Sequence, residues 1–186
     1  MLVFVGCSSD DDESNGDTPS LPETVSIQQA TTGAYEMKDF DADMEVNVEG
    51  NMLYVAVQGK NYEGKVSFNN QKVLFDNTLD AVLTLDVGGT SNPDTLELAL
   101  KTQMTFEILG ENELRFYVDE NDSSDEPLKL IDGIELDDMI FSVAERTTKR
   151  LRLQGDIDGS IDLGGVLPGT SGSQQAVGVI KITLDR

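Results

Sequence analysis

The chain has 186 residues and a formal net charge of -22, and residues 10–23 contribute six acids and no base to that charge. A protein this acidic is repelled by phosphate backbones, so we expect no nucleic-acid partner. The sequence contains no histidine, which excludes a Ser-His-Asp triad and any imidazole ligand for a metal.

The N-terminus combines a short apolar run with the only cysteine of the chain. Residues 1–4 are apolar, and Val5-Gly6-Cys7 follows them directly. This arrangement resembles the processing site of a bacterial lipoprotein, which implies that Cys7 is lipidated and becomes the new N-terminus. Residues 1–6 are too few for a charged segment followed by an apolar segment of about 7–15 residues. The resemblance therefore implies that the true start lies upstream of Met1 or that the sequence is truncated.

An acidic tract comes directly after this cysteine. Asp10, Asp11, Asp12 and Glu13 resemble the export signal of surface lipoproteins in the Bacteroidota, which directs a lipoprotein to the outer face of the outer membrane. The resemblance implies a lipid-anchored protein on the bacterial cell surface that contacts the membrane through its lipid only. The alternative interpretation is a free thiol in a disordered acidic leader.

The sequence predicts three parts. Residues 1–7 are a truncated lipoprotein signal segment, residues 8–23 are an acidic flexible tether, and residues 24–186 are a single all-β domain. The sequence has no run of about 18 apolar residues, so we expect no transmembrane helix.

The first half of the body alternates apolar and polar residues with a period of two, which predicts strands. Residues 42–48 alternate, and Gly50-Asn51 signals a turn. On the next strand, Tyr54 and Ala56 make the second face apolar as well. We expect another turn at residues 59–61 and a further hairpin turn at Asn69-Asn70.

The second half continues this pattern with one long strand and one unclear region. The longest alternation covers residues 95–108, and we expect a bend or bulge near Thr102 because the usual strand has about 5–6 residues. An acidic loop at 119–126 precedes a short strand at 128–130. Residues 134–144 fit a strand or a helical turn or two. Further strands are predicted around residues 151–163 and at residues 176–184.

These elements predict an all-β domain without a long helix. We expect an antiparallel β-sandwich of about ten strands. The alternative is a lipocalin-like β-barrel, because Thr32-Gly33-Ala34-Tyr35 resembles the Gly-x-Tyr/Trp entry of lipocalin-like barrels.

One acidic pattern is a candidate for a weak calcium site. Asp156, Asp158 and Asp162, with Ser160 between them, place oxygen atoms at every second position, as in a calcium-binding loop. Gly159 falls at position four of such a loop rather than six, and position twelve is Leu167. The alternative is a strand whose solvent-facing residues are acidic. The loop 119–126 is a second candidate for weak calcium binding.

The function predicted from these features is non-enzymatic. Paired carboxylates, as in glycoside hydrolysis, are the only catalytic groups left. Aromatic residues, which would form the subsites of such an enzyme, make up only 6% of the chain. We expect a surface lipoprotein of the outer membrane with a binding or accessory role in an envelope complex, and an outer-membrane protein as its partner. The alternatives are a lipocalin-like carrier of a small apolar ligand and a subunit of a surface fibre that uses residues 176–184 as a donor strand. Apart from weak calcium, no cofactor is expected.

Overall fold

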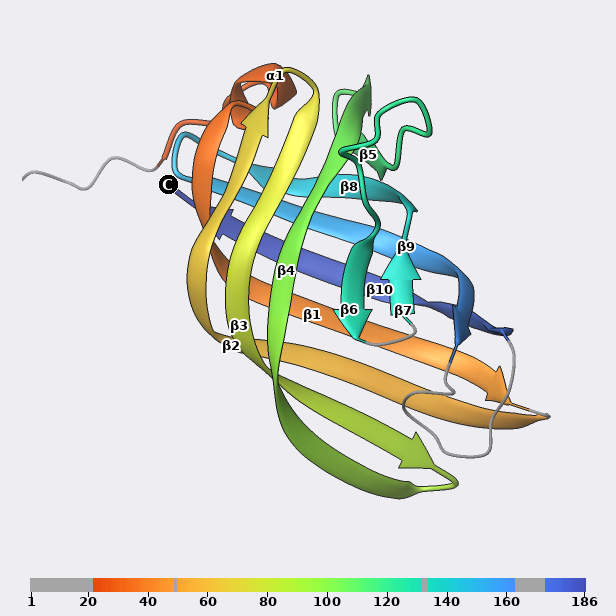
Figure 1. Cartoon of the computed structure of the whole chain (residues 1–186). Helices are drawn as coiled ribbons and strands as arrows, with labels where there is room; N and C mark the ends of the chain where they lie inside the picture. The colour runs from red at the N-terminus through yellow and green to blue at the C-terminus, as the bar shows by residue number, and fades with distance from the viewer. Residues whose placement is uncertain (1–21, 49, 132–133, 163–172) are drawn as a thin grey trace, which may run out of the picture.

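A computed structural model describes residues 22–48, 50–131, 134–162 and 173–186 of the chain (Figure 1). No helix within these ranges is long and apolar enough to cross a membrane. The structure is almost entirely strand, so the all-β prediction is confirmed. The described elements are α1 (Ile27–Ala30), β1 (Gly33–Val48), β2 (Asn51–Asn69), β3 (Lys72–Val87), β4 (Thr90–Gly110), β5 (Glu113–Tyr117), β6 (Leu128–Ile131), β7 (Ile134–Leu136), β8 (Asp138–Arg146), β9 (Arg150–Asp162) and β10 (Ser173–Asp185).

Eight of these strands form one antiparallel sheet that closes on itself. Its order is β1-β10-β9-β8-β5-β4-β3-β2, and β2 pairs with β1 to complete the circle. The predicted two-sheet sandwich is therefore wrong, and the arrangement is the closed barrel that was the alternative. A period of two reports only that one face is buried, which a sandwich and a closed sheet share. The length of the strands makes the difference, because β1 to β4 have between 16 and 21 residues and can coil around a common interior.

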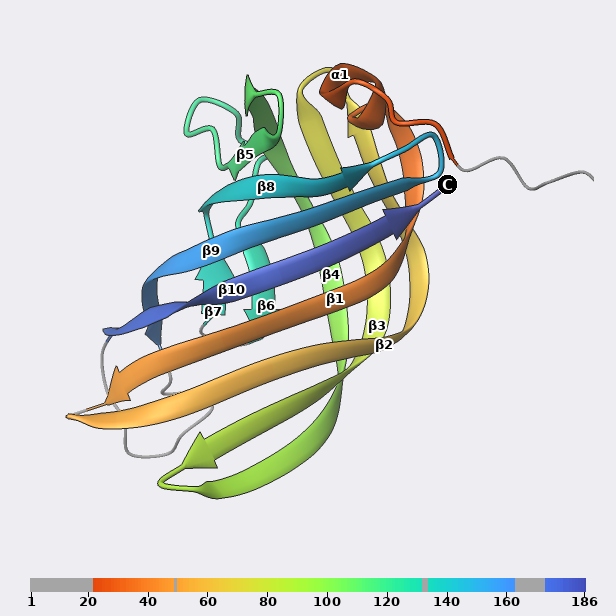
Figure 2. The same ribbon diagram turned by 180° about the vertical axis from the view of Figure 1, so that it is seen from behind.

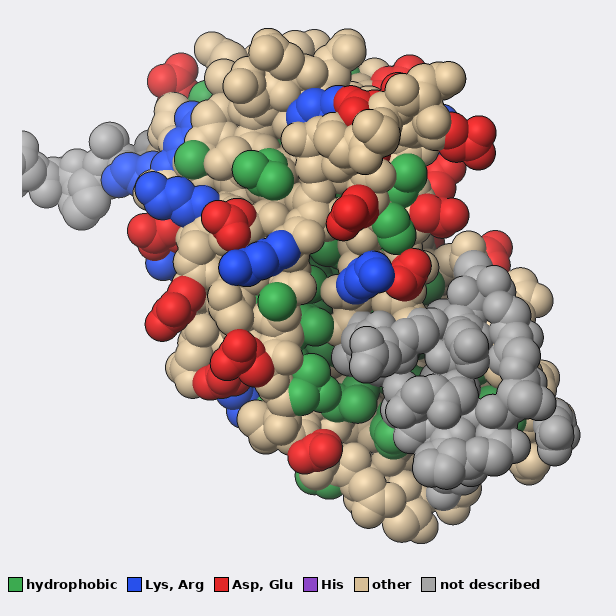
Figure 3. All heavy atoms as spheres, in the orientation of Figure 1, with side chains coloured by type: hydrophobic (Ala, Val, Ile, Leu, Met, Phe, Trp, Pro, Cys, Tyr) green, Lys and Arg blue, Asp and Glu red, His purple; other side chains and the backbone are tan. Residues whose placement is uncertain are grey.

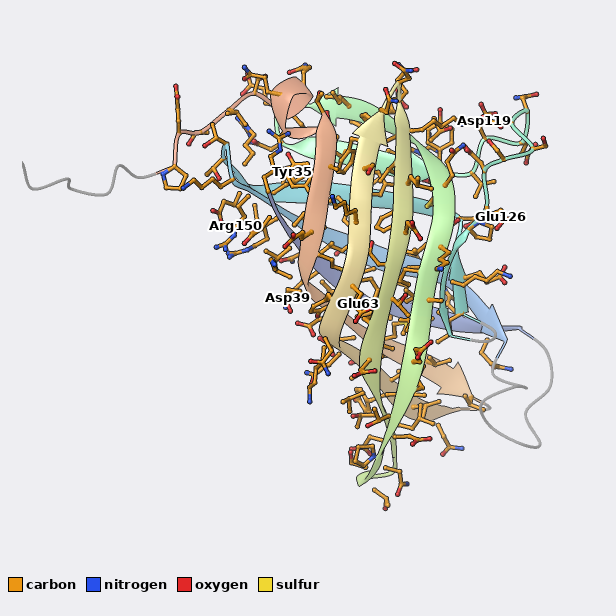
Figure 4. The ribbon with its side chains drawn as sticks, turned by 60° about the vertical axis from the view of Figure 1, so that its left-hand side comes forward. Tyr35, Asp39, Glu63, Asp119, Glu126 and Arg150 are labelled. Atoms are coloured by element: carbon orange, nitrogen blue, oxygen red, sulfur yellow. The ribbon has the colours of Figure 1, made fainter. Side chains whose placement is uncertain are left out.

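A bend in the long strands replaces one of the predicted turns. The turn at Gly50 forms as expected, with a φ of +86° that favours glycine. Residues 59–61 are not a turn, because β2 continues through them with an irregular register and a left-handed Asn61 (φ 51°). Figure 4 shows Asp39 and Glu63 at the level where β1 and β2 change direction. The turn signal at residues 59–61 is thus a β-bulge, which bends a strand without ending it.

Two other local predictions are settled by the pairing. The register of β3 with β4 is continuous through Thr102, so the bulge expected there is absent from this pairing. The irregularity in β4 lies between Ile108 and Gly110. Residues 134–144, which also fitted helical turns, lie in β7 and β8.

Aromatic side chains fill the end of the barrel that lies near α1. The ring centroids of Tyr35 and Phe68 are 5.9 Å apart, and those of Phe68 and Phe106 are 5.5 Å apart. Phe116 and Phe141 continue the cluster with centroids 4.9 Å apart. Such edge-on and tilted arrangements suit the quadrupoles of aromatic rings. This end of the barrel is therefore a packed core.

The helix α1 is held over that end by contacts from both ends of the described domain. The hydroxyl of Tyr35 donates a hydrogen bond to the carbonyl of Ala30. The guanidinium of Arg186 lies 4.6 Å from the centre of the Tyr35 ring and donates to the carbonyls of Gln29 and Thr32. The Gly-x-Tyr sequence thus links α1 and β1 to the residue that follows β10.

The hairpin of β6 and β7 is a separate two-stranded sheet that packs against β4 and β9. It lies between β4 and β9 in both ribbon views (Figures 1 and 2), below the level where β5 and β8 bridge those two strands. The hydroxyl of Thr102 on β4 donates to the carbonyl of Glu126 over 2.7 Å and fixes the entry to the hairpin. The inward-facing residues of the hairpin are buried: Leu128, Leu130, Ile134 and Leu136.

Candidate functional site: an apolar groove on the outer face

Two neighbouring rows of side chains cross the outer face of the barrel, over the strands that Figure 2 shows in front. The antiparallel register aligns outward-facing residues of adjacent strands, which lie about 4.8 Å apart. From β9 to β4, the first row is Asp158, Val177, Glu45, Tyr54, Asp86 and Ser91. The second row is Asp156, Val179, Asp43, Ala56, Thr84 and Pro93. Acidic residues on β9 and β1 therefore alternate with apolar residues on β10 and β2.

The middle of these rows is hollowed into a groove of about 420 Å³. Its apolar side chains are unusually open to solvent, because Tyr54 is 50% exposed and Val177 is 46% exposed. Gly178 also lines the groove, and a Cβ atom there would lie 2.1 Å from the carbonyl oxygen of Asp43. Only glycine permits this close approach of β10 to β1. The groove thus has an apolar wall on each side of β1, formed by residues of β10 and β2.

The carboxylates around the groove have no cationic partner. Neither row contains a lysine or an arginine. In the described part of the chain, no ion pair involves the five carboxylates of the rows: Asp43, Glu45, Asp86, Asp156 and Asp158. Asp86 accepts a hydrogen bond from the amide of Gly89, and Asp158 accepts one from the side chain of Gln175. The face therefore presents apolar surface inside a field of uncompensated negative charge.

The acidic stripe on β1 continues beyond the groove to Asp41. Partial burial raises the pKa of Asp41, and the negative charges of Asp39 and Asp43 raise it further. Lys181, which pairs with Asp41 across β1 and β10, lowers it in part. The raised pKa of Asp41 therefore reflects mainly its partial burial, with a smaller contribution from the like charges of β1.

The residues of the predicted calcium site lie beside this groove. Asp156 and Asp158 are exposed on the outer face of β9, opposite Val179 and Val177. Asp162 is in the last position of β9, and its side chain lies outside the described residues. Among the residues whose side chains are described, no three carboxylates come together in a way that could hold a metal ion. Calcium binding by Asp156, Asp158 and Asp162 stays a prediction.

The acidic loop at 119–126 uses one of its carboxylates to attach itself to the barrel. The side chain of Asp125 is fully buried and accepts hydrogen bonds from Lys72 over 2.7 Å and from Thr105 over 2.6 Å. Burial opposes ionisation of Asp125, but these bonds and one from the amide of Asp119 keep its pKa below the usual value. Asp122 also pairs with Lys72, at 2.7 Å. Figure 4 shows Asp119 and Glu126 at the two ends of this loop.

A second hollow, of about 600 Å³, lies between β5 and the start of this loop. Its arginine is already engaged, because Arg115 donates to Asp138 over 2.9 Å and lies 4.9 Å from the centre of the Tyr117 ring. The same bond lowers the pKa of Asp138. This hollow also has unpaired carboxylates, because no ion pair of the described residues involves Asp119, Glu120 or Asp137. Its apolar residues are only partly exposed, however, and it lacks the open apolar side chains of the groove.

Part of the groove was visible in the sequence. Tyr54 and Ala56 made the second face of their strand apolar, which is the signal that β2 carries apolar residues outward. The sequence does not place Val177 and Val179 on the same surface as Tyr54 and Ala56. Only the register of β1 with β10 brings the two valines next to β1 and close to β2. Cys7 and residues 10–13 lie outside the described residues.

Comparison with known proteins gives no family for the chain: no protein-family model matches it, and no curated protein matches it.

Proposed function

We propose that this protein is a lipid-anchored, non-enzymatic surface lipoprotein that binds a partner in the envelope through the outer-face groove. Cys7 would carry the lipid, and Asp10 to Glu13 would direct the protein to the cell surface. The barrel would then present the groove to a neighbouring protein. This proposal joins the resemblance of the N-terminus to the one surface hollow described above that combines exposed apolar side chains with unpaired charge.

The groove carries the binding part of the proposal. Burying exposed apolar surface is worth about 25 cal/mol per Å². Tyr54 offers an aromatic ring with a polar tip, a residue type enriched where protein interfaces concentrate their binding energy. The inward side chains of the barrel strands, by contrast, form one buried hydrophobic cluster together with those of β6 and β7.

The experiment is a mild-detergent purification of the tagged, lipidated protein from its native envelope, followed by mass spectrometry. We expect a stoichiometric outer-membrane partner with the natural protein and its loss in the double variant Tyr54→Ser, Val177→Ser. The matched control is Leu74→Ser, Ile140→Ser, which removes two apolar side chains that are 44% and 52% exposed elsewhere on the barrel. A partner that stays with the groove variant, or the absence of any partner, would contradict the proposal.

A second candidate function is that of a carrier for a small apolar ligand inside the barrel. One observation favours it: Asn77 is fully buried on the inward face of β3, and its side-chain oxygen has no hydrogen-bond partner. The amide nitrogen of the same side chain donates to the carbonyl of Glu63 over 3.3 Å. A buried acceptor without a donor costs about 1–3 kcal/mol, so a ligand with a hydroxyl or amide group would be stabilised there.

Native mass spectrometry of the purified protein tests this candidate. A carrier retains a small molecule at unit stoichiometry, and Asn77→Leu loses it because the variant removes the acceptor. A protein that has the mass of its own chain and lipid alone would contradict the carrier function.

The third alternative, a fibre subunit, required β10 as a donor strand or a long unpaired edge. In the structure, β10 pairs with β1 along one edge and with β9 along the other. The strand is thus already used within its own chain, and we do not propose the fibre function.

A further inference from the structure

We infer that the partner segment bound in the groove is a basic, extended peptide whose lysine or arginine side chains place their charges over the acidic stripe of β1 and their aliphatic stems against Tyr54 and Val177. This inference rests on the proposed function and names the chemistry of the partner. It follows from the order of side chains across β9, β10, β1 and β2.

The first argument is the geometry of the stripes. Residues at every second position of a strand lie about 6.8 Å apart on one face. Asp41, Asp43 and Glu45 therefore form a line of carboxylates along β1. A peptide in an extended conformation has the same repeat on each of its faces, so a cation at every second position of the peptide can face one carboxylate of β1.

The second argument is the pair of apolar walls on either side of this line. Val177 on β10 and Tyr54 on β2 pair with Glu45 from opposite sides, so each lies about 4.8 Å from the acidic stripe. The aliphatic stems of lysine and arginine can cover such walls while their charged ends reach the carboxylates. A cation over the ring of Tyr54 gains a further cation–π attraction.

The third argument is charge complementarity. The two rows hold five carboxylates and no cation, and the cation nearest to them along β10 is Lys181, beside Asp41. An acidic or neutral segment would leave these charges uncompensated or repel them, whereas a basic segment relieves the repulsion along β1. The chain as a whole, at -22, also attracts a basic segment from a distance.

The experiment measures the affinity of the purified folded protein for a fluorescent peptide of about eight residues that alternates lysine with serine, so that all lysines share one face of the extended peptide. We expect saturable binding that weakens steeply with added salt, because the contacts are partly exposed ion pairs. The double variant Asp43→Lys, Glu45→Lys reduces the affinity about tenfold or more, since it replaces two attractions with two repulsions. Tyr54→Ser also reduces it, because the apolar wall is lost.

The matched control is Glu97→Lys, Glu113→Lys, which reverses two exposed carboxylates on β4 and β5 and changes the net charge by the same amount. We expect this control to lower the affinity for the peptide only by the amount that the change in net charge accounts for. Equal losses in the two double variants, no effect of Tyr54→Ser, or spermidine competing as well as the peptide would overturn the inference, because attraction would then be by net charge alone.

The outcomes also separate this inference from the proposed function. If the lysine peptide fails to bind while a partner from the envelope still depends on Tyr54 and Val177, the groove is a binding site for a segment of other chemistry, and only the inference fails. If neither the peptide nor an envelope partner depends on these residues, both fail.

Discussion

At the scale of single residues, Asp125 shows that an acid in a strongly acidic chain can be part of the structure. Its side chain is fully buried, and Lys72, Thr105 and Gln103 all donate to it. Asp122 binds the same lysine from a more exposed position. Side chains of β3 and β4 thus attach the loop to the barrel through this one carboxylate.

The first prediction concerns the stability that this contact provides. Replacement of Asp125 by Asn should lower the free energy of unfolding by about 2–3 kcal/mol near neutral pH, because Lys72 loses a buried charged partner. Asp122→Asn is the matched control and should cost less, since Asp125 still holds the lysine. Urea unfolding monitored by circular dichroism measures both variants.

The pH dependence of this contribution has a definite sign. The folded-state pKa of Asp125 is lowered, whereas an aspartate in the unfolded chain has a pKa of about 3.9. The contribution is therefore present above that value and is lost as the pH falls through the lowered pKa. The difference in stability between the natural protein and Asp125→Asn should narrow below about pH 4. A difference that stays constant on acidification would contradict an ionised Asp125 in the folded state.

At the scale of elements, the β6–β7 hairpin contributes more to the core than the length of its strands suggests. The two strands have four and three residues, yet their inward side chains are almost entirely buried between β4 and β9. Figure 3, in the orientation of Figure 1, shows hydrophobic side chains between charged ones on this face of the molecule. The hairpin is therefore part of the fold.

The second prediction tests that role. Leu130→Ala should lower the free energy of unfolding by about 3 kcal/mol, because it removes a fully buried side chain and leaves a cavity. Leu74→Ala makes the same chemical change at a site that is 44% exposed and should stay within about 0.5 kcal/mol of the natural protein. Denaturant unfolding gives both values, and equal losses would show that the hairpin does not pack as described.

The third prediction concerns the attachment of α1. Arg186→Ala removes the guanidinium over Tyr35 and two hydrogen bonds to the carbonyls of Gln29 and Thr32. Amide hydrogen exchange at Ala30 and Thr31 should accelerate about fivefold or more, because the helix opens locally at lower cost. Arg115→Ala, which removes a similar contact over Tyr117, should leave these amides unchanged. Unchanged exchange in Arg186→Ala would mean that other contacts hold the helix.

At the scale of the whole molecule, the fourth prediction tests the anchor. Cys7→Ala should move the protein from the membrane fraction to the soluble fraction, because the lipid would be its only attachment. Ser8→Ala next to it is the matched control and should stay in the membrane fraction. Detergent phase partitioning that is the same for Cys7→Ala and the natural protein would contradict lipidation.

The fifth prediction separates export from anchoring. Replacing Asp10, Asp11, Asp12 and Glu13 by alanine should leave the protein in the membrane fraction but protect it from protease added to intact cells. Equal cleavage of the variant and the natural protein would show that this tract is not the export signal.

The fold could be predicted from the sequence only as far as local patterns reach. Alternation identified the inward residues of most strands, and Gly50 marked its turn, because both are properties of adjacent residues. The residues at 59–61 predict a turn where the structure has a bulge, because a bulge uses the same residue types as a turn. Closure of the sheet and the position of Val177 beside Glu45 depend on pairing between distant strands, which no local pattern contains.

Closure of the barrel also sets an order for its assembly. Glu36, near the start of the body, pairs with Asp185, near its end, so the seam between β1 and β10 forms only after the last strand exists. Until then the edge of β1 that pairs with β10 is unpaired. Because the chain is synthesised from its N-terminus, this edge is accessible to other molecules before β10 exists. The carboxylates of the acidic stripe oppose such contacts, because Asp41, Asp43 and Glu45 repel the same residues of a second nascent chain.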